Sequence, residues 1–349
     1  MKRISKKRLI ICILTVILVD VVIGCLLLTN PSFSRLAMWN IIESDKQDDF
    51  YWKPEDDPEY FHFEPNSDKL SIFRNEIFSL VNDESNELER AVKIARYVGN
   101  IATPPTAQLR GRHTPRLQWD SPQGLLKQMR AGRSGGHCFH YSILYSTYLS
   151  SIGMRSRLWA LEGDDGLGRD SHSITEVYIG SLKKWILIDV TLGIYFTKEN
   201  YPLSVLELRD ELLEEEAEKI LVHSVSERSC SPNIAFERYA RLLKCVFLRT
   251  GNDFANKYDA RIRYGAFSRF QRYLDKLPSV WRRGLNYLLG RRDFLMHYVD
   301  KFSGSLRMES IIARSLFYFF IFSLVSTGIL LIILFLSFLK RYLQDSVNI

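Results

Sequence analysis

The chain has 349 residues, of which 46% are hydrophobic and 25% are charged. This composition excludes a largely disordered protein, because disordered chains carry too few apolar residues to form a core. The length allows one sizeable domain with attached segments. The net charge of +7 is unevenly spread, since residues 43–64 hold nine acids against two lysines and residues 224–310 hold 17 Lys and Arg against eight Asp and Glu.

Two apolar runs lie near the ends of the chain. Leu9–Leu28 has 20 residues and Ser315–Leu339 has 25 without a charge, so each is long enough to cross a bilayer as a helix. Basic residues precede the first run and follow the second, which predicts cytoplasmic termini and an extracytoplasmic segment 30–310. The sequence therefore predicts a protein of the inner or plasma membrane. Its basic region is then expected to meet anionic lipid or polymer, with no nucleic-acid partner.

The first run has an alternative interpretation as a cleaved signal peptide, because Val22–Cys25 resembles a lipoprotein cleavage site. Asp20 interrupts the run and apolar residues continue past Cys25, which favours an uncleaved span. A carboxylate at this depth is costly without a partner, and depth counting pairs Asp20 with Ser326 or Thr327 of the second run. A polar residue that is simply tolerated there is the other interpretation.

Between these runs the pattern predicts an acidic and aromatic linker over 30–69, whose Trp52, Phe61 and Phe63 indicate contact with a surface. Helical spacing predicts helices over 70–98, with a break at 82–85, and from Pro122 to Ala131. Further segments are expected at 139–151 (helix), at 155–161, 173–179 and 184–190 (strands), and at 206–222, 234–249 and 260–289 (helices). The predicted organisation is a tail and span (1–29), the linker, a catalytic domain (70–200), a basic helical extension (201–310), and a second span with a tail (311–349).

Gly135, Gly136 and His137 lead into Cys138, directly before a helical run, so a thiol is expected at the first turn of a helix. Unpaired backbone N–H groups and the helix dipole at that place stabilise a thiolate and can bind an oxyanion. His172 and Asp189 follow in strand-like segments. In this order the three residue types predict a nucleophile (Cys138), a base (His172) and an orienting carboxylate (Asp189). Taken singly, each residue is also compatible with a structural role.

Three motifs together resemble the transglutaminase-like superfamily over about residues 85–195. Gly135-Gly136-His137-Cys138, the helix and Ile152-Gly153-Met154-Arg155-Ser156-Arg157 resemble its glycine–x–cysteine, helix and Gly-Ile-Pro-Ala-Arg-like strand entry. His172-Ser173-Ile174-Thr175-Glu176-Val177 resembles its His-Ala-Trp-x-Glu-Val strand, and Trp185-Ile186-Leu187-Ile188-Asp189-Val190-Thr191 its Trp-x-x-x-Asp-Pro-Thr strand. Two departures are Ile174, in place of tryptophan, and Val190, in place of proline.

The resemblance implies an α+β, papain-like core in which the cysteine helix packs on an antiparallel sheet. It implies the same three catalytic residues and an amide carbonyl as the target. Gly136, His137 and Gln123 are expected to contact substrate, and Gln118 or Gln123 is a candidate second oxyanion donor. No cofactor is expected. A metal site of His137, Cys138 and His140 is a poor alternative, because neighbouring residues on one turn rarely converge on an ion.

The remaining cysteines outside the spans are Cys230 and Cys245, which could form a disulfide or remain separate apolar residues. Either way, Cys138 is left unpaired. The sequence therefore predicts a membrane-anchored, extracytoplasmic cysteine enzyme that forms a thioester with a peptide or protein substrate, with hydrolysis favoured over transfer. The alternative is a non-enzymatic envelope or polysaccharide-assembly protein that uses the same fold for binding.

Overall fold

The structure is a computed structural model that describes residues 14–24, 40–56, 58, 61, 63, 65–101, 121–131, 136–163, 171–214, 219–226, 229–249 and 294–347. It divides into two compact units. One unit is Trp39–Leu306, and the other consists of the terminal segments Met1–Met38 and Arg307–Ile349. The first unit therefore contains the whole segment expected as the catalytic domain, the expected linker from residue 39 onward and the expected extension up to residue 306.

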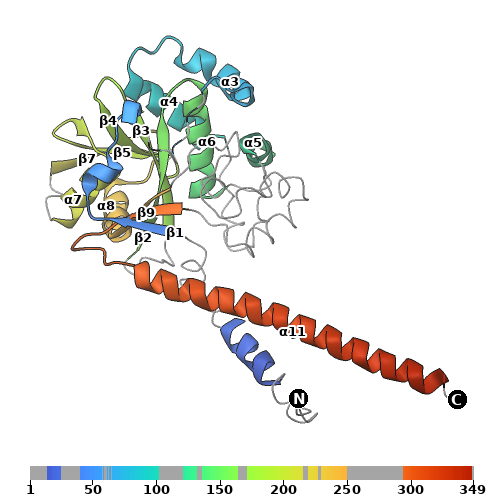
Figure 1. Cartoon of the computed structure of the whole chain (residues 1–349). Coiled ribbons are helices and arrows are strands. Elements are labelled where there is room, and N and C mark those ends of the chain that lie inside the picture. Colours follow the sequence, from blue (N-terminus) through green and yellow to red (C-terminus); the bar gives the residue numbers. More distant parts are fainter. Residues whose placement is uncertain are drawn as a thin grey trace. The chain divides into compact units, whose positions relative to one another are not determined.

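A nine-stranded sheet, counted over the described residues, forms the centre of the first unit (Figure 1). Its strands run in the order β1 (Asn40–Ser44), β9 (Phe294–Tyr298), β8 (Cys245–Arg249), β2 (Ser156–Glu162), β3 (Ser171–Ile179), β4 (Lys184–Asp189), β5 (Ile194–Lys198) and β6 (Tyr201–Pro202), and β7 (Ile220–Ser224) also pairs with β5. All pairs are antiparallel except β1 with β9. The three strands predicted from composition are confirmed as β2, β3 and β4.

One face of the sheet is covered by four helices (Figure 1), namely α3 (Ser71–Val81), α4 (Glu87–Gly99), α5 (Pro122–Arg130) and α6 (Cys138–Ser151). All four confirm predicted helices, including the break between α3 and α4. The side chain of Asn86 caps α4 and that of Ser121 caps α5, where Pro122 occupies the first helical position. Residues 142–149 of α6 are all buried, so this helix is the central element of its layer.

The opposite face is covered by α7 (Val205–Leu213), α8 (Pro232–Leu242) and the aromatic segment after β1. Phe50, Trp52 and Phe61 are buried there, which confirms that the linker lies against a surface. The helices expected at 206–222 and 234–249 are confirmed only in part, as α7 and α8, because 220–224 and 245–249 are strands, and 294–298 is a strand as well. The helix expected at 260–289 lies outside the described residues. At 245–248 the run is buried on both faces of the sheet, and such a run has no period that distinguishes a strand from a helix.

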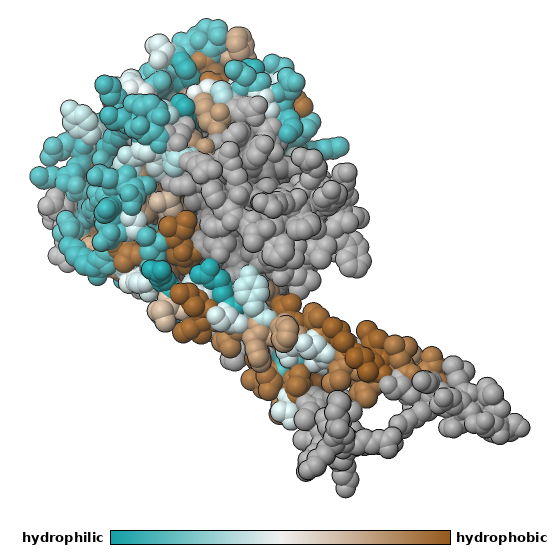
Figure 2. Space-filling model, in the orientation of Figure 1, coloured by the Kyte–Doolittle hydropathy of each residue, from teal (hydrophilic) through white to brown (hydrophobic). Residues whose placement is uncertain are grey.

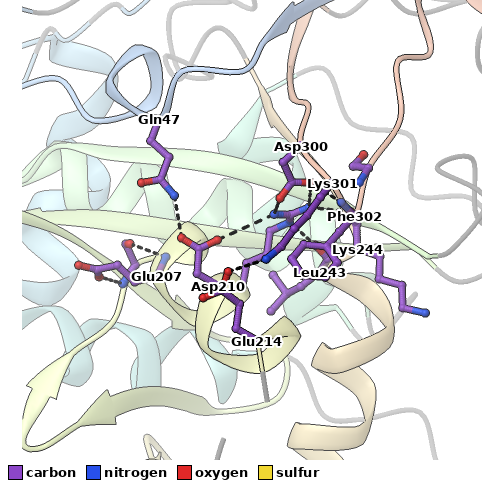
Figure 3. Close-up of polar contacts among 12 residues, drawn as sticks. Gln47, Glu207, Asp210, Glu214, Leu243, Lys244, Asp300, Lys301 and Phe302 are labelled. Atoms are coloured by element: carbon purple, nitrogen blue, oxygen red, sulfur yellow. Dashed lines mark hydrogen bonds and ion pairs between the residues drawn. The ribbon is translucent and has the colours of Figure 1, made fainter. Parts of the chain in front are cut away.

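A polar cluster around α7 joins segments that are distant in sequence (Figure 3). Arg209 is fully buried and forms an ion pair with Asp300, while its Nε donates to the carbonyl oxygen of Leu243 at 2.7 Å. Gln47 donates to Asp210 at 2.7 Å. The cluster therefore holds the segment after β1, the end of α8 and the segment after β9 on the same helix.

In the second unit, α11 (Arg307–Val347) contains a stretch, Arg307–Leu336, of 30 residues, whose most apolar 18 residues have a mean hydropathy of 2.8. At 1.5 Å per residue this stretch is about 45 Å long, which exceeds the apolar thickness of a bilayer. Large apolar side chains are exposed along it, among them Phe322, Ile329 and Phe335, and Figure 2 shows this apolar surface. Such exposure is unfavourable in water and favourable in lipid.

Two membrane spans were expected, but only α11 meets the length and hydropathy of a span among the described residues. The first apolar run is helical over Leu14–Gly24, which is shorter than a span, and its flanks lie outside the described residues. Asp20 is buried. Among the described residues its Oδ1 and the Oγ1 of Thr327 both lack a hydrogen-bond partner, so the bond considered with Thr327 is not formed, while the alternative bond to Ser326 stays a prediction.

Candidate active site

Cys138 is the first residue of α6, and the residues before it fix that position. Gly136 has φ +74, in the left-handed region that favours glycine. A Cβ at this residue would lie 2.8 Å from Cε of Met129 in α5, so the absence of a side chain also allows the close approach to α5. His137 is the residue before the helix and is exposed. The helix start is therefore set by backbone conformation and by contact with α5.

The two histidines that flank Cys138 interact with each other. The backbone N–H of His137 donates to Nδ1 of His140 at 3.0 Å, and the two rings stack with centroids 5.5 Å apart. Burial, with a smaller contribution from the charge of His137, lowers the pKa of His140 to about 4. His140 is therefore neutral at neutral pH, as its role of acceptor at Nδ1 requires.

His172 and Asp189 are brought together by the pairing of β3 with β4. His172 is the second residue of β3 and Asp189 the last residue of β4. Successive side chains of a strand point to opposite faces of the sheet. By this alternation both residues lie on the face that packs against α7 and α8, so their side chains point to the same side. Their atoms Nε2 and Oδ2 lie 2.6 Å apart, and both side chains are 1% exposed. This is a buried, charge-assisted hydrogen bond.

The carboxylate of Asp189 accepts hydrogen bonds at both oxygens. The backbone N–H groups of Thr191 and Leu192 donate to Oδ1 at 2.8 and 3.0 Å, and the hydroxyl of Tyr239 donates to Oδ2 at 2.8 Å. Burial alone would raise the pKa of Asp189, but the imidazole of His172 and these donors outweigh it and lower the pKa. Asp189 is therefore ionised despite complete burial.

The N-terminal half of α6 meets the beginning of β3, where Oγ of Ser142 donates to the carbonyl oxygen of Ser173 at 3.1 Å. This contact brings Cys138 next to His172. Burial raises the pKa of the Cys138 thiol, but His172, as a neighbouring donor and positive charge, and the backbone of Ser173 reverse this effect and lower it. Nδ1 of His172, the ring nitrogen not bonded to Asp189, has no hydrogen-bond partner of standard geometry among the described residues, so it is available to the thiol.

The same contacts act on the imidazole. Burial lowers the pKa of His172, but Asp189 and Cys138 together raise it to about 9. A thiol with a lowered pKa beside an imidazole with a raised pKa favours the thiolate–imidazolium pair near neutral pH. The arrangement can therefore supply a nucleophile at Cys138 and a proton donor at His172.

The structure thus brings together the three residues predicted as catalytic, and it places Gly136 and His137 beside the thiol. Gln123 is exposed in the first turn of α5, and no hydrogen bond joins it to the triad within the described parts of the chain. Gln118 and Gly135 lie outside the described residues. The catalytic roles, and the contacts of Gly136, His137 and Gln123 with substrate, stay predictions.

Tyr239 is a site residue that sequence reasoning missed. It lies in α8, beyond the resemblance, and in the sequence it is one apolar residue among many in a run expected to be helical. Ile174, the first departure from the family pattern, is buried and pairs across the sheet with Trp159 of β2. A tryptophan is therefore present on this face of the sheet, but on the neighbouring strand.

Cys230 and Cys245 are free thiols, so the disulfide considered from sequence is not formed. Cys245 is buried in β8, with Sγ 3.2 Å from Nε2 of His297. Cys230 is half-buried, and burial together with the charge of Asp189 raises its pKa. It therefore differs from Cys138, whose pKa is lowered.

Comparison with known proteins gives a match to a protein family. Residues 77–190 match the family described as the transglutaminase-like superfamily, which confirms the resemblance inferred from the motifs. The matched segment contains α4 to β4 and all three triad residues, and it ends before Tyr239. A search of curated proteins and a search of solved structures each found no significant match.

Proposed function

We propose that this protein, whose residues 77–190 form a transglutaminase-like domain, is a membrane-anchored cysteine enzyme that acts on the amide carbonyl of a peptide or protein. One observation carries the proposal. His172 is bonded to Asp189 at 2.6 Å on one side, while its other ring nitrogen is available to Cys138 at the start of α6. This is the nucleophile–base–orienter relationship of thiol acyl transfer.

In the first half of the reaction, the Cys138 thiolate adds to the carbonyl carbon of the substrate. The negative charge that develops on the carbonyl oxygen is stabilised by unpaired backbone N–H groups in the first turn of α6. When the C–N bond breaks, the imidazolium of His172 gives its proton to the departing amine. The products are a free amine and a thioester on Cys138.

In the second half, neutral His172 takes a proton from a water molecule that adds to the thioester carbonyl. Breakage of the C–S bond releases the carboxylic acid and restores the thiolate–imidazolium pair. Asp189 keeps the imidazole oriented throughout and stabilises its charged form. Hydrolysis is favoured over transfer, because no feature of the described residues specifies an amine as the second substrate.

The membrane part of the proposal is supported by α11, whose apolar side chains are exposed along a stretch long enough to span. Basic residues at Lys340 and Arg341 follow this stretch in the sequence, which favours a cytoplasmic C-terminus. Residues 39–306 would then act outside the cytoplasm of a plasma or inner membrane. Their substrate would be an envelope or surface peptide or protein.

The experiment that tests the proposal is site-resolved alkylation of the full chain in detergent at neutral pH. Iodoacetamide is added for increasing times, and mass spectrometry gives the extent of modification at each cysteine. We expect Cys138 to react at least tenfold faster than Cys230, because only the first thiol has a lowered pKa. The substitution His172→Ala should remove this advantage.

His223→Ala is a matched control, since His223 is a second sheet histidine and its hydrogen bond is to Thr197, away from the triad. It should leave the Cys138 rate unchanged. A substrate trapped as a thioester by the unmodified chain, and absent with Cys138→Ala, would identify the reaction. Equal reactivity of Cys138 and Cys230 would instead favour a binding protein that uses the same fold.

A further inference from the structure

Tyr239 reaches the triad from α8, outside the segment that matches the family. Its hydroxyl lies 2.8 Å from Oδ2 of Asp189, and both residues are fully buried. A buried tyrosine hydroxyl needs an acceptor, but a backbone carbonyl would satisfy it, as the carbonyl of Ala91 does for Tyr145 at 3.0 Å. At Tyr239 the acceptor is the carboxylate oxygen that also binds His172.

The carboxylate of Asp189 is therefore held from two directions. The turn after β4 supplies two backbone N–H groups to Oδ1, and α8 supplies the Tyr239 hydroxyl to Oδ2. Rotation of the carboxylate about its Cβ–Cγ bond would break these bonds. The ring of Tyr239 also meets those of His172 and Phe196 nearly edge-on, with centroid distances of 6.4 and 4.9 Å.

The position of α8 is itself fixed. Arg209 of α7 donates from Nε to the carbonyl oxygen of Leu243 at 2.7 Å and from Nη2 to that of Lys244 at 3.1 Å, just beyond the last turn of α8. Arg209 is paired with Asp300 and is fully buried. The tyrosine hydroxyl is thus placed by a rigid, packed element rather than by a loop.

From this geometry we infer that Tyr239 is a positioning residue, which fixes the orientation of Asp189 and thereby that of His172 toward Cys138. The inference rests on the proposed function. It adds that the active site is completed by α8, so the matched segment alone does not hold every residue that shapes it. Phenylalanine at this position would keep the ring and remove only the hydroxyl.

Loss of the Tyr239 hydroxyl should change the pKa values of Cys138 and His172 in a definite direction. A donated hydrogen bond spreads the negative charge of the carboxylate, so its loss leaves more charge on Oδ2. More negative charge near Cys138 and His172 disfavours the thiolate and favours the imidazolium, which raises both pKa values. Tyr239→Phe should therefore move the pH dependence of Cys138 alkylation upward by half a unit to one unit. At pH values below the pKa of Cys138 it should also slow alkylation about three- to tenfold.

The test is the pH profile of Cys138 alkylation, read by mass spectrometry on the full chain in detergent. Tyr145→Phe is the matched control, because it removes a buried tyrosine hydroxyl bonded to a backbone carbonyl instead of Asp189. Its profile should coincide with that of the unmodified chain. The single variant Asp189→Asn and the double variant Asp189→Asn with Tyr239→Phe should have the same pH profile. The Tyr239 hydroxyl acts through the charge of Asp189, so without that charge its removal should have no effect.

The outcomes distinguish the proposed function from the positioning role of Tyr239. If the unmodified chain shows an ordinary thiol profile at Cys138, the proposed function fails. If alkylation of Cys138 in the unmodified chain rises at a lower pH than that of an ordinary thiol, and Tyr239→Phe does not change this pH, the proposed function stands and Tyr239 is only a packing residue. An equal shift in Tyr145→Phe, or a further shift by Tyr239→Phe in the Asp189→Asn background, also overturns the positioning role.

Discussion

Arg157 and Glu176 form a salt bridge of 2.6 Å in which the side chains are 1% and 0% exposed. They are cross-strand partners on β2 and β3. The guanidinium lies over the rings of Trp52 and Trp185, and one of its nitrogens donates to the carbonyl oxygen of Phe50. A buried charge at the centre of the sheet thus binds the aromatic segment after β1.

This pair should be sensitive to the loss of one partner. In Glu176→Gln the guanidinium of Arg157 stays buried without a counter-charge, which costs about 3–5 kcal/mol. We expect a corresponding decrease in the free energy of unfolding, measured by urea denaturation of the full chain in detergent. Lys301→Ala breaks an ion pair with Glu214 in which both side chains are more than half exposed, and it should have little effect. Equal effects of the two substitutions would contradict this account.

The raised pKa of His172 predicts a dependence of stability on pH. The folded pKa is about 9 against an ordinary value of 6.5, so the folded state binds the proton more tightly than the unfolded state. This contribution is fully present below pH 6.5 and is lost as the pH rises toward 9. A difference of 2.5 units corresponds to about 3 kcal/mol.

The thiol of Cys138 titrates in the opposite sense, so the measurement is best made in a Cys138→Ser chain. There we expect the free energy of unfolding to fall between pH 6.5 and 9, by at most about 3 kcal/mol. The added substitution His172→Gln should remove the decline. A decline of the same size without the histidine would assign it to other groups.

Gly136 should tolerate substitution less well than Gly153. Both have positive φ, +74 and +83, so alanine strains the backbone at either position. Only at Gly136 would the new Cβ meet a neighbour, Cε of Met129 at 2.8 Å, whereas nothing lies within 4 Å of Gly153. We expect Gly136→Ala to be the more destabilising variant by about 1 kcal/mol and to slow alkylation of Cys138. Indistinguishable unfolding curves would show that Met129 moves aside without cost.

The effect of an arginine substitution in the apolar helix α11 should depend on how deep the substituted residue lies in the membrane. Ile329 lies within its apolar stretch with an exposed side chain, and Ile329→Arg should cost about 2.5–3.5 kcal/mol of insertion. In the unmodified chain, a tag after residue 349 should lie on the opposite side of the membrane from residues 39–306. In Ile329→Arg, a smaller fraction of the chains should have the tag on that side. Met308→Arg, in the first turn, should leave the tag where it was. The same tag position for both variants and the unmodified chain would contradict insertion at Ile329.

The family core could be predicted from the sequence because its signals are local. The glycines before Cys138 and the helical run after it defined α6, and alternating or β-rich composition defined β2 to β4. These patterns also set the order of the three triad residues. Their convergence then followed from antiparallel pairing of β3 with β4 and from the packing of α6 on β3.

The rest depended on contacts between distant segments. Val246 and Leu248 of β8, like their neighbours, are buried on both faces, so the run has no alternation and resembles a helix. Tyr239 gave no signal, because its hydroxyl matters only once α8 has been placed beside β4. The pairing of β1 with β9 joins residues about 250 positions apart, which no local pattern encodes.

That pairing has a consequence for synthesis of the chain. β9 lies between β1 and β8 and is made last of all the strands, shortly before α11. Until Phe294–Tyr298 has left the ribosome, β1 has no neighbour and β8 has an open edge, which is prone to wrong pairing. The sheet of the first unit is therefore completed just as the apolar stretch of α11 emerges from the ribosome.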